Sequence, residues 1–189
     1  MNYKNYILAG KLLIVGISIF ALNAQILLAE APKSAIKAYT DYSSTEARDI
    51  LWLARIIYSE SKTTEEQILI AWVVRNRVET GFRGADSYKE VALSHGQFSG
   101  LGLGDPQYKL NISRNYNTTD DKAWMQALTV AQAVYFADDS LRPISIETRH
   151  FYSPISVLNN PKWAKDKEPS IELKNDDGEV RFAFYAGVK

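Results

Sequence analysis

Apolar residues recur at helical spacing between positions 47 and 58, and this pattern predicts an amphipathic helix. Ser43 and Glu46 have the spacing of a capping box, in which both side chains bond backbone amides left unpaired at a helix start. The helix should therefore begin near Ser43 and end near Glu60. Its apolar face consists of Ala47, Ile50, Leu51, Ala54, Ile57 and Tyr58.

The next run, ILIAWVV at residues 68–74, is apolar nearly all round and predicts a helix buried on every side. Thr63 and Thr64 each open a further capping-box pattern before it, and Gly81 should end it. Glu65 and Glu66 are interpreted as exposed acids of the first helical turn, where the helix dipole favours negative charge. Their pKa values should therefore lie at or below the ordinary value.

Asn76 and Arg77, near the end of this buried helix, are expected to bind neighbouring backbone carbonyl groups. The pattern then changes towards strands, with aromatic-rich runs near the C-terminus. The expected segments are a short helix at 87–93, a loop with four glycines at 95–106, a surface connection at 107–118, a helix after 119–121, strands at 148–153 and 179–186, and a turn at 175–178. The expected fold class is α+β, mainly helical, with a small antiparallel sheet towards the C-terminus.

Residues 1–31 differ in composition from the rest of the chain. A start with lysines and no acid precedes an apolar run at 12–22 and small residues at Ala24 and Ala31, which is the pattern of a secretory signal peptide. The alternative is a retained N-terminal membrane anchor over residues 12–29, just long enough to span a bilayer. Both predict an exported protein of the periplasm or cell envelope, with a linker at 32–43 and one domain at 44–189.

Composition excludes several classes of function. The chain has 22 Lys and Arg against 22 Asp and Glu, whereas nucleic-acid binding needs clustered positive charge. It has no cysteine, which excludes disulfides, thiol chemistry and cysteine-ligated metals. His95 and His150 are too few for a catalytic zinc site with three protein ligands. We expect no metal, no other cofactor, no nucleic-acid partner and a monomer.

Glu60 is the candidate catalytic residue on physical grounds. It follows Leu53, Ile56 and Ile57 at the end of the first helix. Burial beside apolar side chains raises the pKa of a carboxyl, and so does the negative end of the helix dipole. A carboxyl that keeps its proton near neutral pH can serve as the general acid in glycosidic bond cleavage. The alternative, a solvated residue of the turn between two helices, stays open on these residues alone.

Several short motifs occur in an order that resembles a known family. They are YSE at 58–60, Gln67 before an apolar helix that ends in NRV at 76–78, GQFSG at 96–100, RHFYSP at 149–154 and PKWA at 161–164. Over residues 50–185 the chain is similar to the cell-wall hydrolases related to spore cortex-lytic enzymes. That family is associated with peptidoglycan cleavage as muramidases or lytic transglycosylases, on a lysozyme-like scaffold.

The resemblance implies that residues 44–189 form a cell-wall hydrolase domain, that peptidoglycan is its partner and that Glu60 is the catalytic acid. It also assigns substrate-binding roles to Tyr58, Gln97, Phe98, Ser99, His150, Tyr152 and Trp163. For Phe98 and the three late residues, a structural role in the core is the alternative.

The chain departs from the family in one place, because Ser61-Lys62-Thr63-Thr64 stands where Ala-Arg-Gly-Glu is commoner. The second acidic position of the motif is thus open between Glu65 and Glu66. Glycoside hydrolases need a second carboxylate, and none stands out at a motif position, which favours a lytic transglycosylase. The alternatives are a non-catalytic peptidoglycan-binding protein and a cell-wall amidase.

Overall fold

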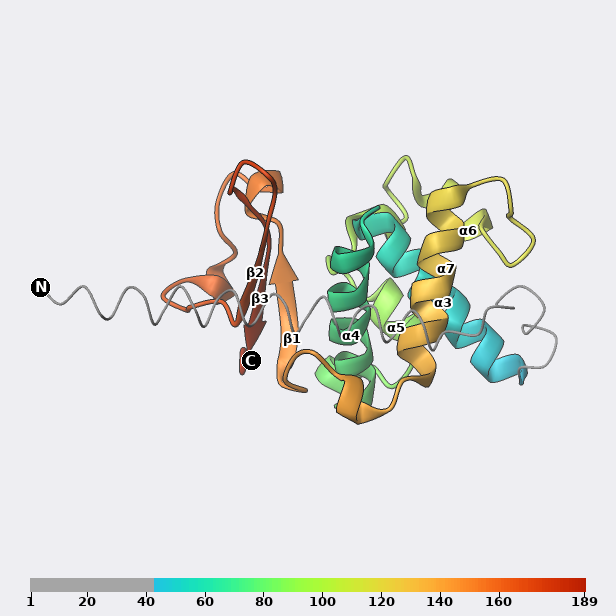
Figure 1. Ribbon diagram of the computed structural model, residues 1–189, viewed down its shortest axis with the longest axis horizontal. Coiled ribbons are helices and arrows are strands. Elements are labelled where there is room, and N and C mark those ends of the chain that lie inside the picture. The colour runs from blue at the N-terminus through green and yellow to red at the C-terminus, as the bar shows by residue number, and fades with distance from the viewer. Residues whose placement is uncertain (1–42) are drawn as a thin grey trace, which may run out of the picture.

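The computed structural model describes residues 43–189, with five α-helices on one side of a three-stranded antiparallel sheet (Figure 1). The predicted α+β class is confirmed, with the sheet towards the C-terminus. The predicted signal peptide or anchor and nearly all of the linker lie outside the described residues. No helix within residues 43–189 has both the length and the apolar character needed to cross a membrane.

Helix α3 (Ser44–Glu60) begins as its sequence predicts. The Ser43 hydroxyl accepts a hydrogen bond from the Glu46 amide at 3.2 Å, and the Glu46 carboxylate accepts one from the Ser43 amide at 2.8 Å. The predicted capping box is therefore confirmed. At the other end the chain turns to an extended conformation at Ser61, whose amide still bonds the Ile57 carbonyl at 3.0 Å. This turn leaves Glu60 as the last helical residue.

Helix α4 (Thr64–Glu79) is buried on every side, as its apolar run predicts: residues 68–74 are at most 1% exposed. The predicted capping boxes at its start are wrong, because the Thr63 side chain caps no amide and the Glu66 carboxylate binds other partners. The chain leaves this helix through Gly81, which has φ 58°, a left-handed conformation that glycine adopts without steric cost.

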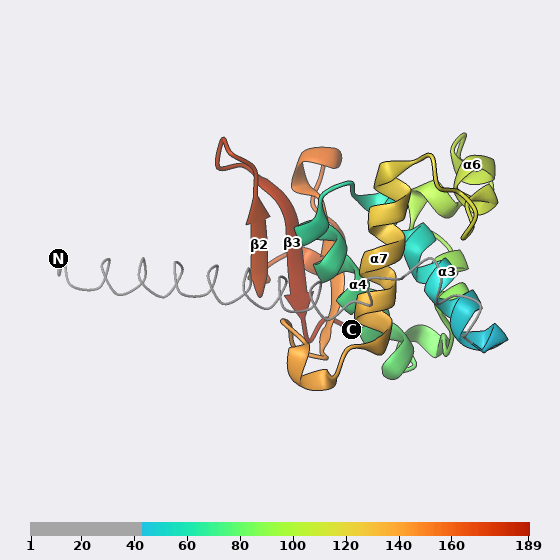
Figure 2. The same cartoon turned by 45° about the vertical axis from the view of Figure 1, so that its right-hand side comes forward.

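Helix α7 (Lys122–Phe136) packs against both α3 and α4, and Figure 2 shows it between the other two. Asp121 caps it by accepting a hydrogen bond from the Trp124 amide at 3.0 Å. Two short helices complete the layer, α5 (Tyr88–Leu93) and α6 (Tyr108–Ser113). The expectation of a plain surface connection at 107–118 is wrong, since α6 lies there. Its cap residue, Gln107, makes no side-chain hydrogen bond, so the usual start signal is missing.

The sheet has the order β1-β3-β2, with β1 (Thr148–Tyr152) and β2 (Ile171–Lys174) each antiparallel to the central β3 (Val180–Ala186). Phe184 lies opposite Phe151 on one side and Ile171 on the other. Strand β2 is an element that the sequence pattern did not predict. The expected turn at 175–178 joins it to β3, with Gly178 at φ 82°.

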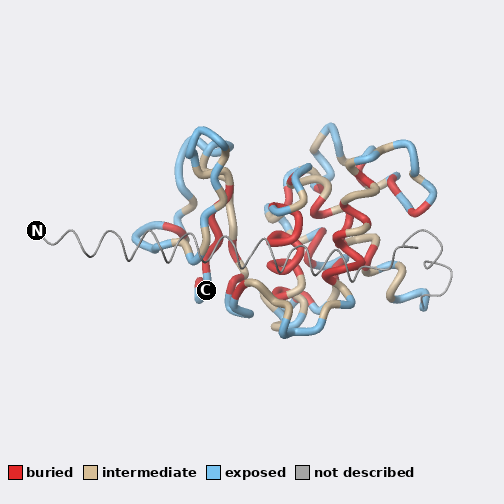
Figure 3. The backbone as a smooth tube through the Cα atoms, in the orientation of Figure 1, coloured by how far each residue is buried: buried red, intermediate tan, exposed pale blue. Residues whose placement is uncertain are grey.

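The hydrophobic core lies mainly around α4, between α3, α7 and the sheet, where buried backbone gathers in Figure 3. A second, smaller cluster of Ala164, Ala183, Tyr185 and Val188 lies on the sheet. Single turns of 3-10 helix fill the connections: η2 (Phe82–Gly84), η3 (Ser99–Leu101), η4 (Asp139–Leu141), η5 (Pro154–Ser156) and η6 (Lys162–Ala164).

The end of α4 is tied to the sheet by side-chain hydrogen bonds. Asn76 Nδ2 donates to the carbonyls of Ser145 and Thr148, at 3.0 and 2.9 Å, and Arg77 Nε donates to that of Arg149 at 2.7 Å. The prediction that these two residues bind neighbouring carbonyls is confirmed. These bonds hold strand β1 against the helix that carries Arg77.

Candidate active site

The Glu60 carboxyl is partly buried and has no hydrogen-bond or ion-pair partner among the described residues. Burial raises the pKa of its carboxyl from 4.5 to about 7, although the positive charges of Arg77 and Lys62 act to lower it. Within residues 43–189, no group donates a hydrogen bond to this carboxyl and no ion pair holds it. The neutral form of Glu60 therefore persists to a higher pH than that of an ordinary carboxyl, and no hydrogen bond from the described residues competes for it.

Arg77 lies beside Glu60 and is itself 5% exposed. Burial and the charge of Arg83 lower the pKa of its guanidinium to about 10, while Glu60 acts to raise it. Of its nitrogens only Nε has a hydrogen-bond partner within the described chain, and Nη1 is buried without one. The guanidinium lies over the rings of Phe98 and Phe82, at 5.4 and 5.9 Å. These contacts fix its position next to Glu60.

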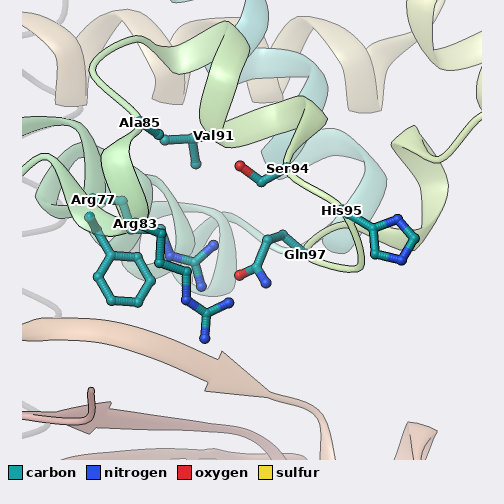
Figure 4. Close-up of a pocket in the computed structure, with 8 residues that line it drawn as sticks. Arg77, Arg83, Ala85, Val91, Ser94, His95 and Gln97 are labelled. Atoms are coloured by element: carbon teal, nitrogen blue, oxygen red, sulfur yellow. The ribbon is translucent and has the colours of Figure 1, made fainter.

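Two pockets each contain one of the two charged neighbours of Glu60, although Glu60 itself lines neither of them. The arginine pocket, of about 240 Å³, is lined by Arg77, Phe82, Arg83, Ala85, Val91, Ser94, His95 and Gln97 (Figure 4). The tyrosine pocket, of about 370 Å³, is lined by Tyr58, Ser59, Lys62, Ser99, Gly100, Asp105, Gln107, Leu110 and Asn111.

The loop from Gln97 to Ser99 contributes to both pockets. Gln97 lines the arginine pocket and Ser99 lines the tyrosine pocket, in keeping with the roles expected for them. Phe98, between them, is only 3% exposed and packs against Phe151 with ring centroids 6.4 Å apart. Direct contact of Phe98 with a ligand is therefore a misassignment from the sequence, since its ring anchors the loop in the core.

Gly100 is required by the close packing of this loop. A Cβ atom there would lie 3.1 Å from Asn111 Nδ2 and 3.1 Å from Ser59 Cβ, closer than such atoms normally approach. The absence of a side chain lets Asn111 donate a hydrogen bond to the Gly100 carbonyl at 2.8 Å. The loop is thereby held against the end of α3 that carries Glu60.

Tyr58 is fixed by charged groups on one edge of the tyrosine pocket. Its hydroxyl donates to Asp121 Oδ2 at 2.8 Å and accepts from Arg114 at 2.6 Å, while Lys62 Nζ lies 3.5 Å from its ring centre. Partial burial acts to raise the pKa of Asp121, but hydrogen bonds from Trp124, Arg114 and Tyr58 lower it to about 2. The hydroxyl of Tyr58 is thereby occupied, and the Arg114 guanidinium also lies over its ring at 4.3 Å, so the substrate-binding role of Tyr58 stays a prediction.

Glu66 differs from the exposed helix-start acid that its position predicts, because it is 5% exposed. It accepts a short hydrogen bond from the Ser61 hydroxyl, and its Oε1 lies 2.8 Å from Arg181 Nε as an ion pair without hydrogen-bond geometry. Glu65 is exposed as expected, but partial burial and the charge of Glu66 raise its pKa, so the expected ordinary or low value is wrong. Neither acid lines the two pockets.

The three late residues of the predicted site gather beside the sheet. His150 is 3% exposed and lies between Phe82 and Trp163, at 5.1 and 4.9 Å between ring centres. Burial and the charges of Arg77, Arg83 and Arg149 lower its pKa to about 4, so its ring is neutral at pH 7. Direct contact of His150 with a ligand does not fit this burial.

Tyr152 and Trp163 are half-buried and pack edge to face, with ring centres 5.6 Å apart. They also contact Tyr185, and through His150 the cluster reaches Phe82 of the arginine pocket. Both side chains are partly exposed, and their predicted role as ligand contacts stays a prediction.

Two charged residues of the site were not expected from the sequence. Lys62 lies at the turn that departs from the family pattern, and Arg83 lies between two glycines in GFRG at 81–84. Arg83 has φ 57°, a left-handed conformation that costs a residue other than glycine about 1 kcal/mol. The pair of flanking glycines was the available signal for such a turn.

Comparison of the chain with protein-family models, with curated proteins and with solved structures gives no match. Within residues 43–189, no three His, Cys, Asp or Glu side chains gather as metal ligands would.

Proposed function

We propose that this protein cleaves the β-1,4 bond between N-acetylmuramic acid and N-acetylglucosamine in peptidoglycan, with Glu60 as general acid and base. The observation that carries the proposal is the Glu60 carboxyl, whose pKa is raised to about 7 and which has no hydrogen-bond partner in residues 43–189. Its two charged neighbours, Arg77 and Lys62, each line a pocket. A glycosidase acid must keep its proton near neutral pH and must lie where a sugar chain can pass. The arrangement of a helical layer beside a small sheet supports a lysozyme-like scaffold at a coarse level.

The reaction begins with the neutral form of Glu60. Its proton passes to the oxygen that leaves with N-acetylglucosamine, the glycosidic bond breaks, and positive charge develops on the muramic acid ring. Glu60 is then a carboxylate, and the nearby charges of Arg77 and Lys62 stabilise that form. The carboxylate finally takes a proton from the C6 hydroxyl of muramic acid, whose oxygen closes a 1,6-anhydro ring, or from water in hydrolysis.

The acids around the site favour the anhydro product. Glu66 is engaged by Ser61 and Arg181, and Asp121 by Tyr58 and Arg114. Asp105 is the acid that lines one of the two pockets, and its Oδ1 already accepts a hydrogen bond from the Gln107 amide at 2.7 Å. A lytic transglycosylase needs no second carboxylate, so it fits this set better than a hydrolase does. If Asp105 served as the second carboxylate, the enzyme would be a muramidase.

The test is mass spectrometry of the soluble products released from purified sacculi. The wild-type protein should release disaccharide–peptide fragments with 1,6-anhydromuramic acid ends, and Glu60→Gln should release essentially none. Reducing muramic acid ends would identify a muramidase instead. Free peptides without sugar would indicate an amidase, and binding to sacculi without any release would indicate a non-catalytic binding protein; either result would overturn the proposal.

A further inference from the structure

The arginine pocket is lined by two positively charged side chains and by no negatively charged one, and Glu60, the carboxyl that acts on Arg77, lies outside this lining. Arg77 and Arg83 both line it, and no Asp or Glu does. Within residues 43–189, Arg83 forms no hydrogen bond or ion pair, and the charge of Arg83 acts on Arg77 to lower its pKa. The two guanidinium groups therefore repel each other across a pocket whose lining contains no counter-charge from the described chain. An anion from a ligand would relieve that repulsion.

The donors needed to bind an anion are also present. Arg77 is 5% exposed, uses only Nε within residues 43–189, and leaves the donors on both terminal nitrogens free of a partner there. Figure 4 shows the guanidinium groups of Arg77 and Arg83 pointing toward the side-chain amide of Gln97, while the His95 ring points away. A planar guanidinium with free donors is suited to bind a carboxylate with two parallel hydrogen bonds.

The other walls of the pocket suit an acidic amino acid. Phe82, Ala85 and Val91 form an apolar surface that an aliphatic stem can cover, and Ser94 and Gln97 offer hydroxyl and amide groups for a peptide backbone. This combination of apolar wall, amide and paired arginines matches a side chain that ends in a carboxylate. A bare phosphate diester would leave the apolar wall unused.

We infer that the arginine pocket binds a carboxylate of the peptide stem attached to the muramic acid next to the cleaved bond. The inference rests on the proposed function, because it takes the glycan to run past Glu60. Arg77 adjoins both the pocket and Glu60, so a stem bound there would place its own sugar at the acid. The peptide would then orient the glycan and make the enzyme selective for chains that carry acidic stems.

The first test compares KM for peptide-bearing glycan chains before and after their peptide carboxylates are amidated. The wild-type protein should show a KM about 10-fold lower for the free carboxylates, the lower end of the range for a charge-assisted hydrogen bond. Arg83→Gln should raise that KM to the value of the amidated chains. Arg48→Gln removes an equal charge from the distant start of α3 and should keep the wild-type ratio. Equal KM values in the wild-type protein would overturn the inference while leaving cleavage intact.

A second test does not depend on cleavage. Calorimetric titration of the Glu60→Gln variant with the soluble peptide alanyl-glutamyl-diaminopimelyl-alanine should show binding. This binding should be lost when the peptide carboxylates are amidated, and also when Arg83→Gln is introduced as a second substitution in the protein. This difference is expected even if no glycan is cleaved, a result that would reject the proposed function alone. Equal or undetectable binding of both peptides would overturn the inference. So would a lower KM for chains stripped of peptide, whose free lactyl carboxylate would then be the bound group.

Discussion

At the scale of single residues, Glu60 is held between two opposing effects. Burial favours its neutral form, while the positive charges of Arg77 and Lys62 favour the charged form. The pKa of about 7 is the net result of burial and these two charges. Both forms occur in a general acid–base cycle, first as donor and then as acceptor. A value near working pH serves both steps, because neither form is strongly disfavoured.

Removing one of the two charges should shift this balance. In Lys62→Met the pKa of Glu60 should rise further above its ordinary value, because an attraction that stabilises the carboxylate is lost. The pH at which activity falls should move up by roughly half a unit, as expected for a charge near a protein surface. The measurement is turnover of soluble glycan chains as a function of pH. Lys89→Met, on α5, is the control, and an unchanged or lower pH for Lys62→Met would contradict the assigned role.

The burial of Glu60 also predicts an effect on stability that does not involve activity. In the folded protein the pKa of Glu60 is about 7, above the ordinary value of 4.5. Between these two pH values the folded state therefore keeps a proton on Glu60 that the unfolded chain has already released. The resulting stabilisation is complete below about pH 4.3 and is lost as pH rises through about 7. Glu60→Gln cannot ionise and should therefore be more stable than the wild-type protein at pH 8, by roughly 1–3 kcal/mol.

The check is denaturant unfolding at pH 4 and pH 8. The difference between Glu60→Gln and wild type should be small at pH 4 and should grow towards pH 8. Glu168→Gln, at an exposed position, is the matched control and should show no such growth. A difference that is the same at both pH values would mean that Glu60 is solvated in the folded protein.

At the scale of elements, the turn between α3 and α4 fixes the position of Glu60. Gln67 Nε2 donates to the Ser61 carbonyl at 2.9 Å, and the Glu66 carboxylate accepts from the Ser61 hydroxyl while Arg181 of β3 lies against it. The turn is thus bound both to the next helix and to the sheet. Glu66 has a structural role here, although the family motif left it open as a second acid.

Glu66→Gln should separate this structural role from a catalytic one. The variant keeps a hydrogen-bond acceptor for Ser61 but loses the ion pair with Arg181, whose side chain is 43% exposed and so remains partly solvated. We expect a loss of stability of about 1–2 kcal/mol and activity well above that of Glu60→Gln at a temperature where both are folded. If Glu66→Gln is inactive while Glu60→Gln is active, the catalytic acid has been assigned to the wrong residue.

The long elements could be predicted from the sequence because their signals are local. The capping box of α3, the apolar run of α4 and the aromatic alternation of β1 and β3 each depend on residues close together in the chain. The short elements α6 and β2 were missed because the local signal is absent in α6 and extends over only four residues in β2. Helix α6 has no capping side chain, and β2 is four residues of alternating polarity that pair with β3.

At the scale of the whole molecule, the site depends on contacts between distant segments, which local patterns do not report. The Arg77 side chain borders Glu60 because α3 and α4 pack together, and Glu66 is buried because β3 brings Arg181 to it. The motifs therefore indicated Glu60, Gln97 and Ser99, and they implied substrate contacts for Phe98 and His150 with a role in the core as the alternative. The structure buries both of these residues. The paired arginines of one pocket became visible only in the folded arrangement.

The proposed activity also needs the protein to leave the cytoplasm, which predicts the processing of its N-terminus. The apolar run at 12–22 and the small residues after it should be removed, leaving a mature start near Gln25 or Pro32. N-terminal sequencing of the exported protein checks this directly. Recovery of Met1 in the membrane fraction would decide for a retained anchor.

The dependence of activity on pH tests the central claim most directly, because it joins the identity of the acid to the reason for its placement. Turnover of soluble glycan chains should be measured from pH 4 to 9 for the wild-type protein and Glu60→Gln. In the wild type, kcat/KM should fall as pH rises through about 7, where the half-buried Glu60 loses its proton. Glu60→Gln should be slower by at least ~10²-fold at every pH, the usual contribution of general acid–base catalysis. Activity that stays constant up to pH 9, or a Glu60→Gln variant with more than about a tenth of wild-type turnover, would contradict the account.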